Sequence, residues 1–513
     1  MSSSSLAYLS DFKPDTEESV IESVGAGPHL VALPTPEFPR VLQHKDLQVL
    51  VSSGQELPRG TWVLMGCDHI GIVTSHREDL AVVRLLCEKG DEGWGQIRHP
   101  VPIGDEVSSV PLPVWEEIQQ SRFKDRFPIG TIRQPNCRPT AYVPLLNQHR
   151  LLLVGQSGSG KSSARQTMLV NWRLSLKRQG HHPLPGLLCL DLHGDDLGRV
   201  TDDQGVIRPS LVSCFPAEEI EIIDSTRLQC TFRDLPAPLL LDCIPKLSGP
   251  QARWRDLYVV KNTSHDAIAA LLNDDSDWNK AFPELQTESI VKKNGQMFIR
   301  KEITRQVRES LSALRSKLKA VLSAPLFRDP KDPVGEGKIH WNIIFQWLME
   351  GKVVIVDVAD FPENQQNLLV VLLIRSLMAR QWIRQRSKQP IHPVVITGDE
   401  IHLLHHAGHI IEKLFLEGRK LRIGGLFGSQ ELTHFSKSVI SGATGGIVLR
   451  SEDATVEAVC RKWPQARQVA EDIRSLRNGS AFYFFGGSAP WPVDVWEAAP
   501  EAEYLRKVSK NAK

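Results

Sequence analysis

A short apolar run, Leu151–Val154, leads directly into a turn rich in glycine and serine, and Lys161 follows with hydroxyl residues after it. The turn fits the pattern GxxxxGK[S/T], which extends from Gly155 to Ser162. Small residues there let consecutive backbone N–H groups surround phosphate oxygens at the start of a helix. The alternative is an ordinary Gly/Ser turn. The strand pattern before the turn and the helical pattern after it favour phosphate binding.

The same pattern assigns roles within the loop. Lys161 would reach the β and γ phosphates of a nucleotide, and the Ser162 hydroxyl would bind Mg²⁺. We therefore predict a nucleotide site with Mg²⁺ as the metal. The predicted phosphate-binding residues are Gly155, Gln156, Ser157, Gly158, Ser159, Gly160, Lys161, Ser162 and Ser163.

Composition restricts the class of protein. A length of 513 residues is enough for about three domains. Lys plus Arg number 61 and Asp plus Glu 60, so the chain is not a broadly basic nucleic-acid binder, and any contact with a polyanion must be local. The eight cysteines form no CxxC pair, which indicates reduced thiols. We find neither a membrane-length apolar run nor a signal peptide, and expect a cytoplasmic protein that does not associate with membranes.

The first quarter of the chain is β-rich. Residues 1–26 are polar and read as a flexible tail, and residues 27–125 carry short strand-like runs with Gly, Asp and Pro between them. These features predict a small barrel or sandwich, closed by Pro111 and Pro113 and a polar linker over 116–126. The predicted strands are 29–33, 47–51, 61–65, 70–74 and 80–86.

Residues 126–495 alternate strands and helices and predict an α/β domain with a mainly parallel sheet, followed by a tail over 496–513. We expect a helix over 161–178, a helical insertion at about 245–345, and strands at 151–154, 186–190, 353–356, 394–397, 423–427 and 446–449. Ligands bind at the carboxyl ends of such strands. The loop, Asp191, Asp399 and Gln430 all follow strand ends and should converge.

Hydrolysis needs a metal ligand and a group that activates water. Two strands end in acids: 353–356 runs into Asp357, and 394–397 leads to Asp399 and Glu400. We prefer the second, because Asp399 can hold Mg²⁺ while Glu400 polarises the attacking water. Gln430 would hydrogen-bond the water or the γ-phosphate.

Two further features have competing interpretations. Apolar residues repeat at helical spacing from Ile303 to Val321, with Arg305, Arg308, Arg315 and Lys319 on the other face. This basic face is either solvated, which we prefer, or a contact for DNA or a neighbouring subunit. His402, His406 and His409 share one helical face beside His405, yet no carboxylate lies among them at ligand spacing, so we favour His402 as a polar neighbour of the active site over a metal site.

The ordered motifs resemble the HerA branch of the HerA/FtsK ATPases. They are GQSGSGKSS at 155–163, DLHGDD at 191–196, GDEIH at 398–402, LEGRKLRIGGLFGSQ at 416–430 and GGIVLR at 445–450. Residues 58–64 and 71–74 also resemble the HAS barrel that precedes the ATPase core in that family. The resemblance covers most of residues 45–490 and is weakest in the insertion.

The resemblance implies a RecA-like P-loop core in a homohexamer that hydrolyses ATP with Mg²⁺ and draws double-stranded DNA through its pore, commonly with a nuclease partner in DNA-end processing or antiphage defence. It implies catalytic roles for Lys161, Glu400 and Gln430 and a nucleotide-site role for Asp191. Arg419 matches the second arginine of the family's R-E-G-R-K, but Leu416 replaces the first. The chain also has His149-Arg150 where Arg-His is common.

Arg419, and after it Arg150, are therefore the candidates for an arginine that acts across a subunit interface. For Arg419 the alternative is a cation that stabilises a helix C-terminus. Two other functions stay open: a regulatory or scaffold ATPase ring that assembles and gates an effector nuclease, and a DNA-packaging or conjugation motor.

Overall fold

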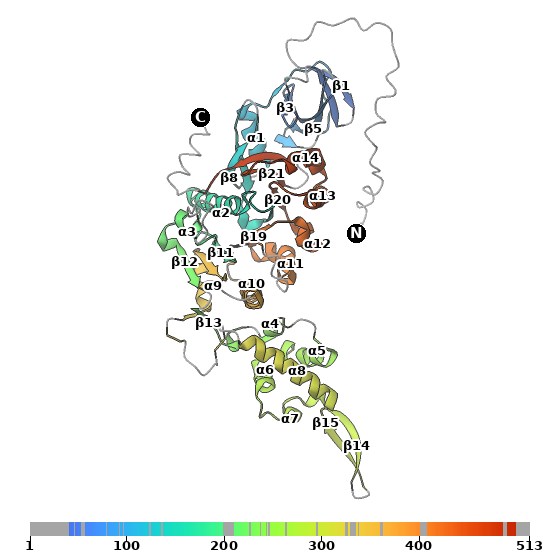
Figure 1. Cartoon of the computed structure of the whole chain (residues 1–513), viewed down its shortest axis with the longest axis vertical. Coiled ribbons are helices and arrows are strands. Elements are labelled where there is room, and N and C mark those ends of the chain that lie inside the picture. Colours follow the sequence, from blue (N-terminus) through green and yellow to red (C-terminus); the bar gives the residue numbers. More distant parts are fainter. Residues whose placement is uncertain are drawn as a thin grey trace.

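The computed structural model describes residues 40–498 with short gaps, and these residues form three parts along one long axis (Figure 1). A small β-sheet stands at one end, the α/β domain lies in the middle, and a largely helical part projects from the other end. The gaps are 46, 53–56, 78–79, 92, 96, 123–124, 135–136, 199–209, 225–226, 236, 243, 245–246, 262–263, 294–295, 324–326, 329–334, 337, 360–362, 401–407 and 486–489.

The N-terminal sheet is antiparallel, with the order β1-β2-β5-β4-β3-β7, and β6 pairs with β5. A bridge between Arg40 and Glu106 joins the two ends of this order, so the sheet curls on itself. The predicted strand at 29–33 lies outside the described residues. The strands are β1 (Val41–Lys45), β2 (Gln48–Ser52), β3 (Trp62–Met65), β4 (His69–Arg77), β5 (Leu80–Gly90), β6 (Gly93–Gly95) and β7 (Val107–Ser109).

The segment expected to link the two domains contains a helix, α1 (Leu112–Arg122), which lies between β7 of the N-terminal sheet and β8 of the central sheet. Trp115 and Ile118 of α1 are fully buried, and the Trp115 ring packs against Trp62 of β3 and Trp491 of β22 at centroid distances of 4.7 and 6.3 Å. The few apolar residues of a polar stretch thus hold the N-terminal sheet against the α/β domain.

The central sheet has eleven strands in the order β12-β17-β11-β18-β19-β10-β20-β21-β22-β8-β9. The pairs from β12 to β20 are parallel, and those from β20 to β9 are antiparallel. Its strands are β8 (Arg126–Ile132), β9 (Thr140–Pro144), β10 (Arg150–Val154), β11 (Gly186–Asp191), β12 (Ile220–Asp224), β17 (Val353–Asp357), β18 (Val394–Gly398), β19 (Ile423–Ser429), β20 (Gly445–Val448), β21 (Ser480–Phe485) and β22 (Trp491–Val495). The mainly parallel α/β sheet expected from the sequence is confirmed.

Both faces of the parallel part are buried, because successive residues of a strand point to opposite faces. In β10, Leu151 and Leu153 pack with α2 (Lys161–Arg178), while Leu152 and Val154 belong to the core under the helices of the other face. Those helices include α9 (Asn342–Met349), α10 (Glu363–Arg386), α11 (Gly408–Glu417), α12 (Lys437–Gly442) and α13 (Asp453–Lys462). Continuous apolar strands are what this two-sided burial requires.

The insertion follows β13 (Leu228–Gln229) and returns to the sheet through β16 (Ile339–His340). Its helices are α4 (Ala237–Asp242), α5 (Gly249–Trp254), α6 (His265–Leu272), α7 (Trp278–Ala281) and α8 (Arg305–Leu322). Leu311, Leu314 and Leu318 of α8 are fully buried, as the helical spacing predicts. However, an antiparallel hairpin of β14 (Thr287–Lys293) and β15 (Gln296–Glu302) projects from this part, where helix was expected.

None of the helices in the described residues is long and apolar enough to cross a membrane. The predicted histidine cluster falls on 401–407 and on the adjoining start of α11, whose side chains lie outside the description.

Candidate nucleotide site

The glycine-rich loop connects the end of β10 to the start of α2, at the carboxyl edge of the sheet. Gly160, the residue before α2, has a φ of 93°, and Gly158 has a φ of 73°. Side chains other than glycine rarely adopt such angles. A Cβ at Gly155 would lie 2.6 Å from Ser159 Oγ and 2.9 Å from Leu449 Cβ. Glycine at these three positions therefore permits the tight turn that aims backbone N–H groups at one point.

A pocket opens over this loop and collects residues from four strand ends. Asp399 and Glu400 follow β18, and Gln430 follows β19. The pocket is lined by Ser157, Gly158, Gly160, Lys161, Ser162, Ser163, His193, Asp195, Asp399, Glu400 and Gln430. Of the predicted loop residues, Gly155, Gln156 and Ser159 do not line it; they shape the turn behind it.

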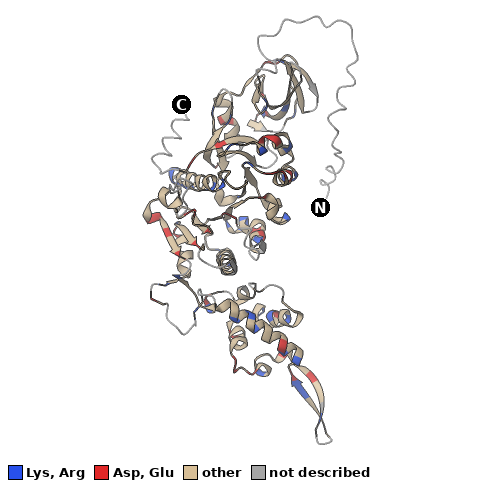
Figure 2. Ribbon diagram, in the orientation of Figure 1, with Lys and Arg blue, Asp and Glu red and all other residues tan. Residues whose placement is uncertain are grey.

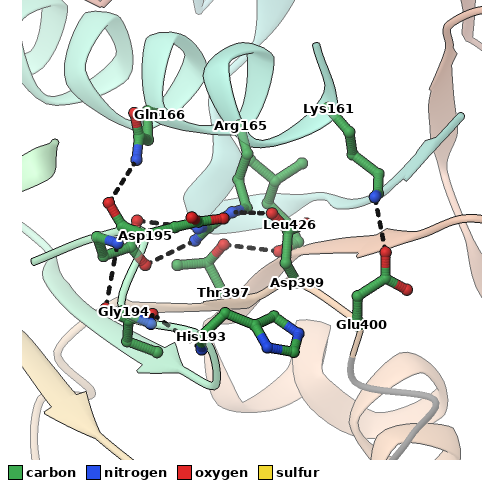
Figure 3. A network of polar contacts seen from close by, with 12 residues as sticks. Lys161, Arg165, Gln166, His193, Gly194, Asp195, Thr397, Asp399, Glu400 and Leu426 are labelled. Carbon is green, nitrogen blue, oxygen red and sulfur yellow. Dashed lines mark hydrogen bonds and ion pairs between the residues drawn. The ribbon is translucent and has the colours of Figure 1, made fainter. Parts of the chain in front are cut away.

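Lys161 and Glu400 face each other across the pocket. Lys161 Nζ donates to Glu400 Oε1 at 2.7 Å, and each side chain is only about a tenth exposed (Figure 3). Glu400 has a φ of 50°, a left-handed backbone that costs about 1–3 kcal/mol for a residue other than glycine. Such a conformation persists where the surrounding structure imposes it. The end of β18 thus turns sharply and aims the Glu400 carboxylate at the phosphate-binding loop.

The order of the strands separates the two acid candidates. β19 alone lies between β10 and β18, so Asp399 and Glu400 end beside the loop. β17, which carries Asp357, lies beyond both β18 and β11. Asp357 pairs in register with Asp191 and does not line the pocket. The arrangement is that of a P-loop nucleotide-binding fold.

Asp399 suits a metal ligand. It is 6% exposed, and Oδ2 lies 3.3 Å from Arg165 Nε in an ion pair, but neither carboxylate oxygen accepts a well-aligned hydrogen bond from the residues that the structure describes. Buried acceptors are normally hydrogen-bonded, so this carboxylate has capacity left for a further partner. Mg²⁺ is commonly held by one or two carboxylates together with substrate phosphates and water. Asp399 and the Ser162 hydroxyl, both at the pocket, fit that donor set.

Asp191 organises a loop and does not line the pocket itself. Its carboxylate accepts backbone N–H groups from Gly194 at 2.8 Å, Asp196 at 3.1 Å and Leu197 at 3.2 Å. Burial, and after it the negative charge of Asp196, raise the pKa of Asp191 to about 6. Arg165 and the N–H groups of Gly194 and Leu197 lower this pKa, but by less. The residue thus holds the loop that brings His193 into the pocket.

His193 and Asp195 were not predicted as site residues, although they stand in the DLHGDD motif. Asp195 is held partly by Gln166 of α2, whose Nε2 donates to the Asp195 carbonyl at 3.2 Å. The sequence feature that could have indicated them is their position directly after β11, because ligands bind at the carboxyl ends of such strands.

The two candidate arginines lie at the opposite edge of the sheet. Arg150 is the first residue of β10, and Arg419 lies in the 3-10 turn Gly418–Leu421 just before β19. Arg150 is 7% exposed, and its Nε and Nη1 have no hydrogen-bond partner in the described part of the chain. Burial, Arg150 and Arg419 together lower the pKa of His149 to about 4. Two arginines, and a histidine that burial and these arginines keep neutral, thus lie at the edge of the sheet opposite the pocket of the same chain.

No protein-family model and no curated protein matches the chain in sequence. Among solved structures, it is similar to the conjugative coupling protein TrwBdeltaN70, with 13% identity over 73% of this chain and 95% of that chain and a TM-score of 0.45. It is also similar to VirB4 of Thermoanaerobacter pseudethanolicus, with 12% identity over 74% of this chain and 98% of that chain and a TM-score of 0.43. A third similar structure is the genome packaging NTPase B204 of Sulfolobus turreted icosahedral virus 2, with 11% identity over 68% of this chain and 98% of that chain and a TM-score of 0.28. The P-loop nucleotide-binding fold is recognised from this chain's own loop, strand order and acid pair.

Proposed function

We propose that the chain is a HerA-type ATPase that assembles into a homohexamer and uses ATP hydrolysis to move double-stranded DNA. The observation that supports this most is the separation of the two parts of a hydrolytic site. The phosphate-binding loop and the acid pair lie at the carboxyl edge of the sheet, and Arg150 and Arg419 lie at its amino edge.

Residues of one chain supply the binding and water-activating groups. Backbone N–H groups of the loop and Lys161 would hold the phosphates, and Ser162 and Asp399 would hold Mg²⁺, which would shield the phosphate charge. ATP draws Lys161 to its phosphates, so that the Glu400 carboxylate is released from the ion pair and can accept a proton from the attacking water. Gln430 orients that water or the γ-phosphate from the next strand.

In this proposal, an arginine of a neighbouring chain stabilises the negative charge on the γ-phosphate during hydrolysis. β10 spans five residues, roughly 16 Å, between Arg150 and the loop, too far for Arg150 to reach its own pocket. A head-to-tail contact would place one chain's amino edge against the next chain's carboxyl edge, and such contacts close into rings. There Arg150 or Arg419 would stabilise the charge that develops on the γ-phosphate, as arginine fingers do.

DNA contacts in this proposal are local. Lys and Arg are interspersed with Asp and Glu throughout the ribbon (Figure 2). On α8, Arg305 pairs with Glu309 at 2.8 Å, and Arg315 and Lys319 both pair with Asp274, at 2.9 and 2.8 Å. These pairs favour the solvated interpretation of that face. The DNA contacts therefore belong to the pore of the assembled ring, where sequence-independent phosphate contacts make binding weaken with salt.

Electron microscopy of the purified protein with a non-hydrolysable ATP analogue and short duplex DNA tests the assembly. The proposal expects a six-fold ring with DNA in its pore, and an ATPase rate that rises when duplex DNA is added. Hydrolysis by a discrete monomer that ignores DNA would contradict it.

The proposal includes a nuclease as the effector partner, on the strength of the family resemblance. Co-purification with the product of a neighbouring gene tests this. If the partner cuts DNA only while Glu400 is intact, hydrolysis drives the complex; if it still cuts with Glu400→Gln, the ring acts as a scaffold.

A further inference from the structure

Arg165 is a fully charged side chain in the interior of the α/β domain. It lies one helical turn after Lys161 on α2 and is 1% exposed. Nη1 and Nη2 donate to the two oxygens of Asp196 at 3.0 and 2.9 Å, and Nε lies 3.3 Å from Oδ2 of Asp399 (Figure 3). Burial opposes the charge, but Asp196 and Asp399 outweigh it and hold the pKa of Arg165 well above its ordinary value.

Two cations near the start of α2 thus contact two adjacent acids. Lys161 pairs with Glu400, and Arg165 pairs with Asp399. Their environments differ, because Lys161 lines the pocket while Arg165 lies behind it, fixed by the bidentate contact to Asp196. A nucleotide can attract Lys161 away from Glu400. Arg165 cannot leave Asp399 in the same way, because it is buried and would have to break its two charge-assisted hydrogen bonds to Asp196.

Asp399 is also confined from the other side. A Cβ on Gly428 of β19 would lie 1.8 Å from Oδ1 of Asp399, well inside any allowed contact. The carboxylate therefore lies over the bare Cα of Gly428, with one oxygen against the neighbouring strand and the other against Arg165. Two independent contacts hold it in one orientation.

We propose that Arg165 and Gly428 are positioning residues that fix the Asp399 carboxylate for the metal-dependent part of nucleotide binding. This inference rests on the proposed nucleotide site. Groups behind a metal ligand orient it, and their substitution typically costs 10–100-fold in metal affinity or activity. The salt bridge to Asp196 anchors Arg165, and through it the loop after β11 is tied to the same carboxylate.

Three variants test the proposal. Arg165→Lys keeps the charge but loses the planar two-pronged donor. Gly428→Ala leaves every charge in place and pushes a methyl group into the carboxylate. Gly425→Ala is the matched control on the same strand, because its Cβ would meet the Phe427 ring and no carboxylate.

The measurement is binding of a fluorescent ATP analogue in EDTA and at increasing Mg²⁺ concentration, with thermal unfolding to establish that each variant is folded. For Arg165→Lys and Gly428→Ala, we expect analogue binding in EDTA to stay as in the wild type. The Mg²⁺ concentration for half of the metal-dependent gain in affinity should rise about tenfold. Gly425→Ala should show the wild-type Mg²⁺ dependence.

Folded Arg165→Lys and Gly428→Ala proteins with the wild-type Mg²⁺ dependence would overturn the inference while leaving the nucleotide site intact. If Arg165→Lys fails to fold, Gly428→Ala decides alone. Wild-type protein that binds no analogue under either condition would overturn the proposed function and, with it, this inference.

Discussion

Lys161 Nζ lies 2.7 Å from Glu400 Oε1, although 239 residues separate the two in sequence. The lysine that should hold phosphate is thus held by the acid that should activate water. Because Glu400 reaches this position with a φ of 50°, the fold imposes the contact on it. A nucleotide must therefore compete with Glu400 for Lys161.

Substitutions of Lys161 and Glu400 should have different effects on nucleotide binding. Lys161→Ala should abolish both nucleotide binding and hydrolysis, because the phosphates lose their cation. Glu400→Gln should keep nucleotide binding and slow hydrolysis by about 10²–10⁴-fold, because the amide cannot accept the proton of the attacking water. Measured dissociation constants and single-turnover rates separate the two effects. Glu431→Gln, a change of the half-exposed acid next to Gln430, is the control and should hydrolyse ATP normally.

Arginines that act in a neighbouring subunit predict complementation. Lys161→Ala and Arg150→Ala proteins should each be inactive alone, but mixed rings contain interfaces that carry both native residues. In an equal mixture about a quarter of the interfaces are of this kind, so hydrolysis should return to a measurable fraction of the wild-type rate. The same mixture with Arg419→Ala identifies which arginine acts. If Arg150→Ala and Arg419→Ala each hydrolyse ATP at the wild-type rate alone, or if an inactive arginine variant is not rescued by Lys161→Ala in mixed rings, the intersubunit site is wrong.

His149 predicts a loss of stability in mild acid. Its pKa is lowered from 6.5 to about 4, so the folded state binds the proton less readily than the unfolded chain. The group therefore contributes stability that is fully present above pH 6.5 and is lost as the pH falls from 6.5 toward 4. Urea unfolding of wild type and His149→Gln at about pH 7.5 and about pH 5 should show the difference in unfolding free energy shrinking in acid. His181→Gln, at an exposed histidine, should show no such change.

The contact between the N-terminal sheet and the α/β domain predicts a large stability effect at Trp115. This side chain is fully buried against Trp62 and Trp491, so Trp115→Ala should lower the free energy of unfolding by about 3–5 kcal/mol. Thermal unfolding followed by calorimetry measures it. Ile103→Ala, at a side chain that is 72% exposed, should change the free energy by less than about 0.5 kcal/mol. A similar loss in both variants would contradict a specific role for the aromatic cluster.

Local signals in the sequence were sufficient for six strands of the central sheet and for the helix that follows the phosphate-binding loop, but they did not reveal β8, β9, β12, β21 or β22. The predicted strands at 151–154, 186–190, 353–356, 394–397, 423–427 and 446–449 correspond to β10, β11, β17, β18, β19 and β20, and the helix at 161–178 is α2. Two-sided burial makes such strands continuously apolar, which is visible in a single sequence. Exposed segments lack this signal, and there one prediction failed: part of the helical insertion is the hairpin β14–β15, whose strand β15 is almost entirely exposed.

The sequence by itself determined the phosphate-binding loop, since its glycines and Lys161 are adjacent in the chain and the backbone conformation they permit is local. Only the tertiary structure decided what faces that loop. The order of the strands brings Glu400 to Lys161 and leaves Asp357 beyond β11, and it places Arg150 at the far edge. It also buries Arg165 between Asp196 and Asp399, a contact no spacing rule shows, because an ion pair across strand ends depends on which strands are neighbours.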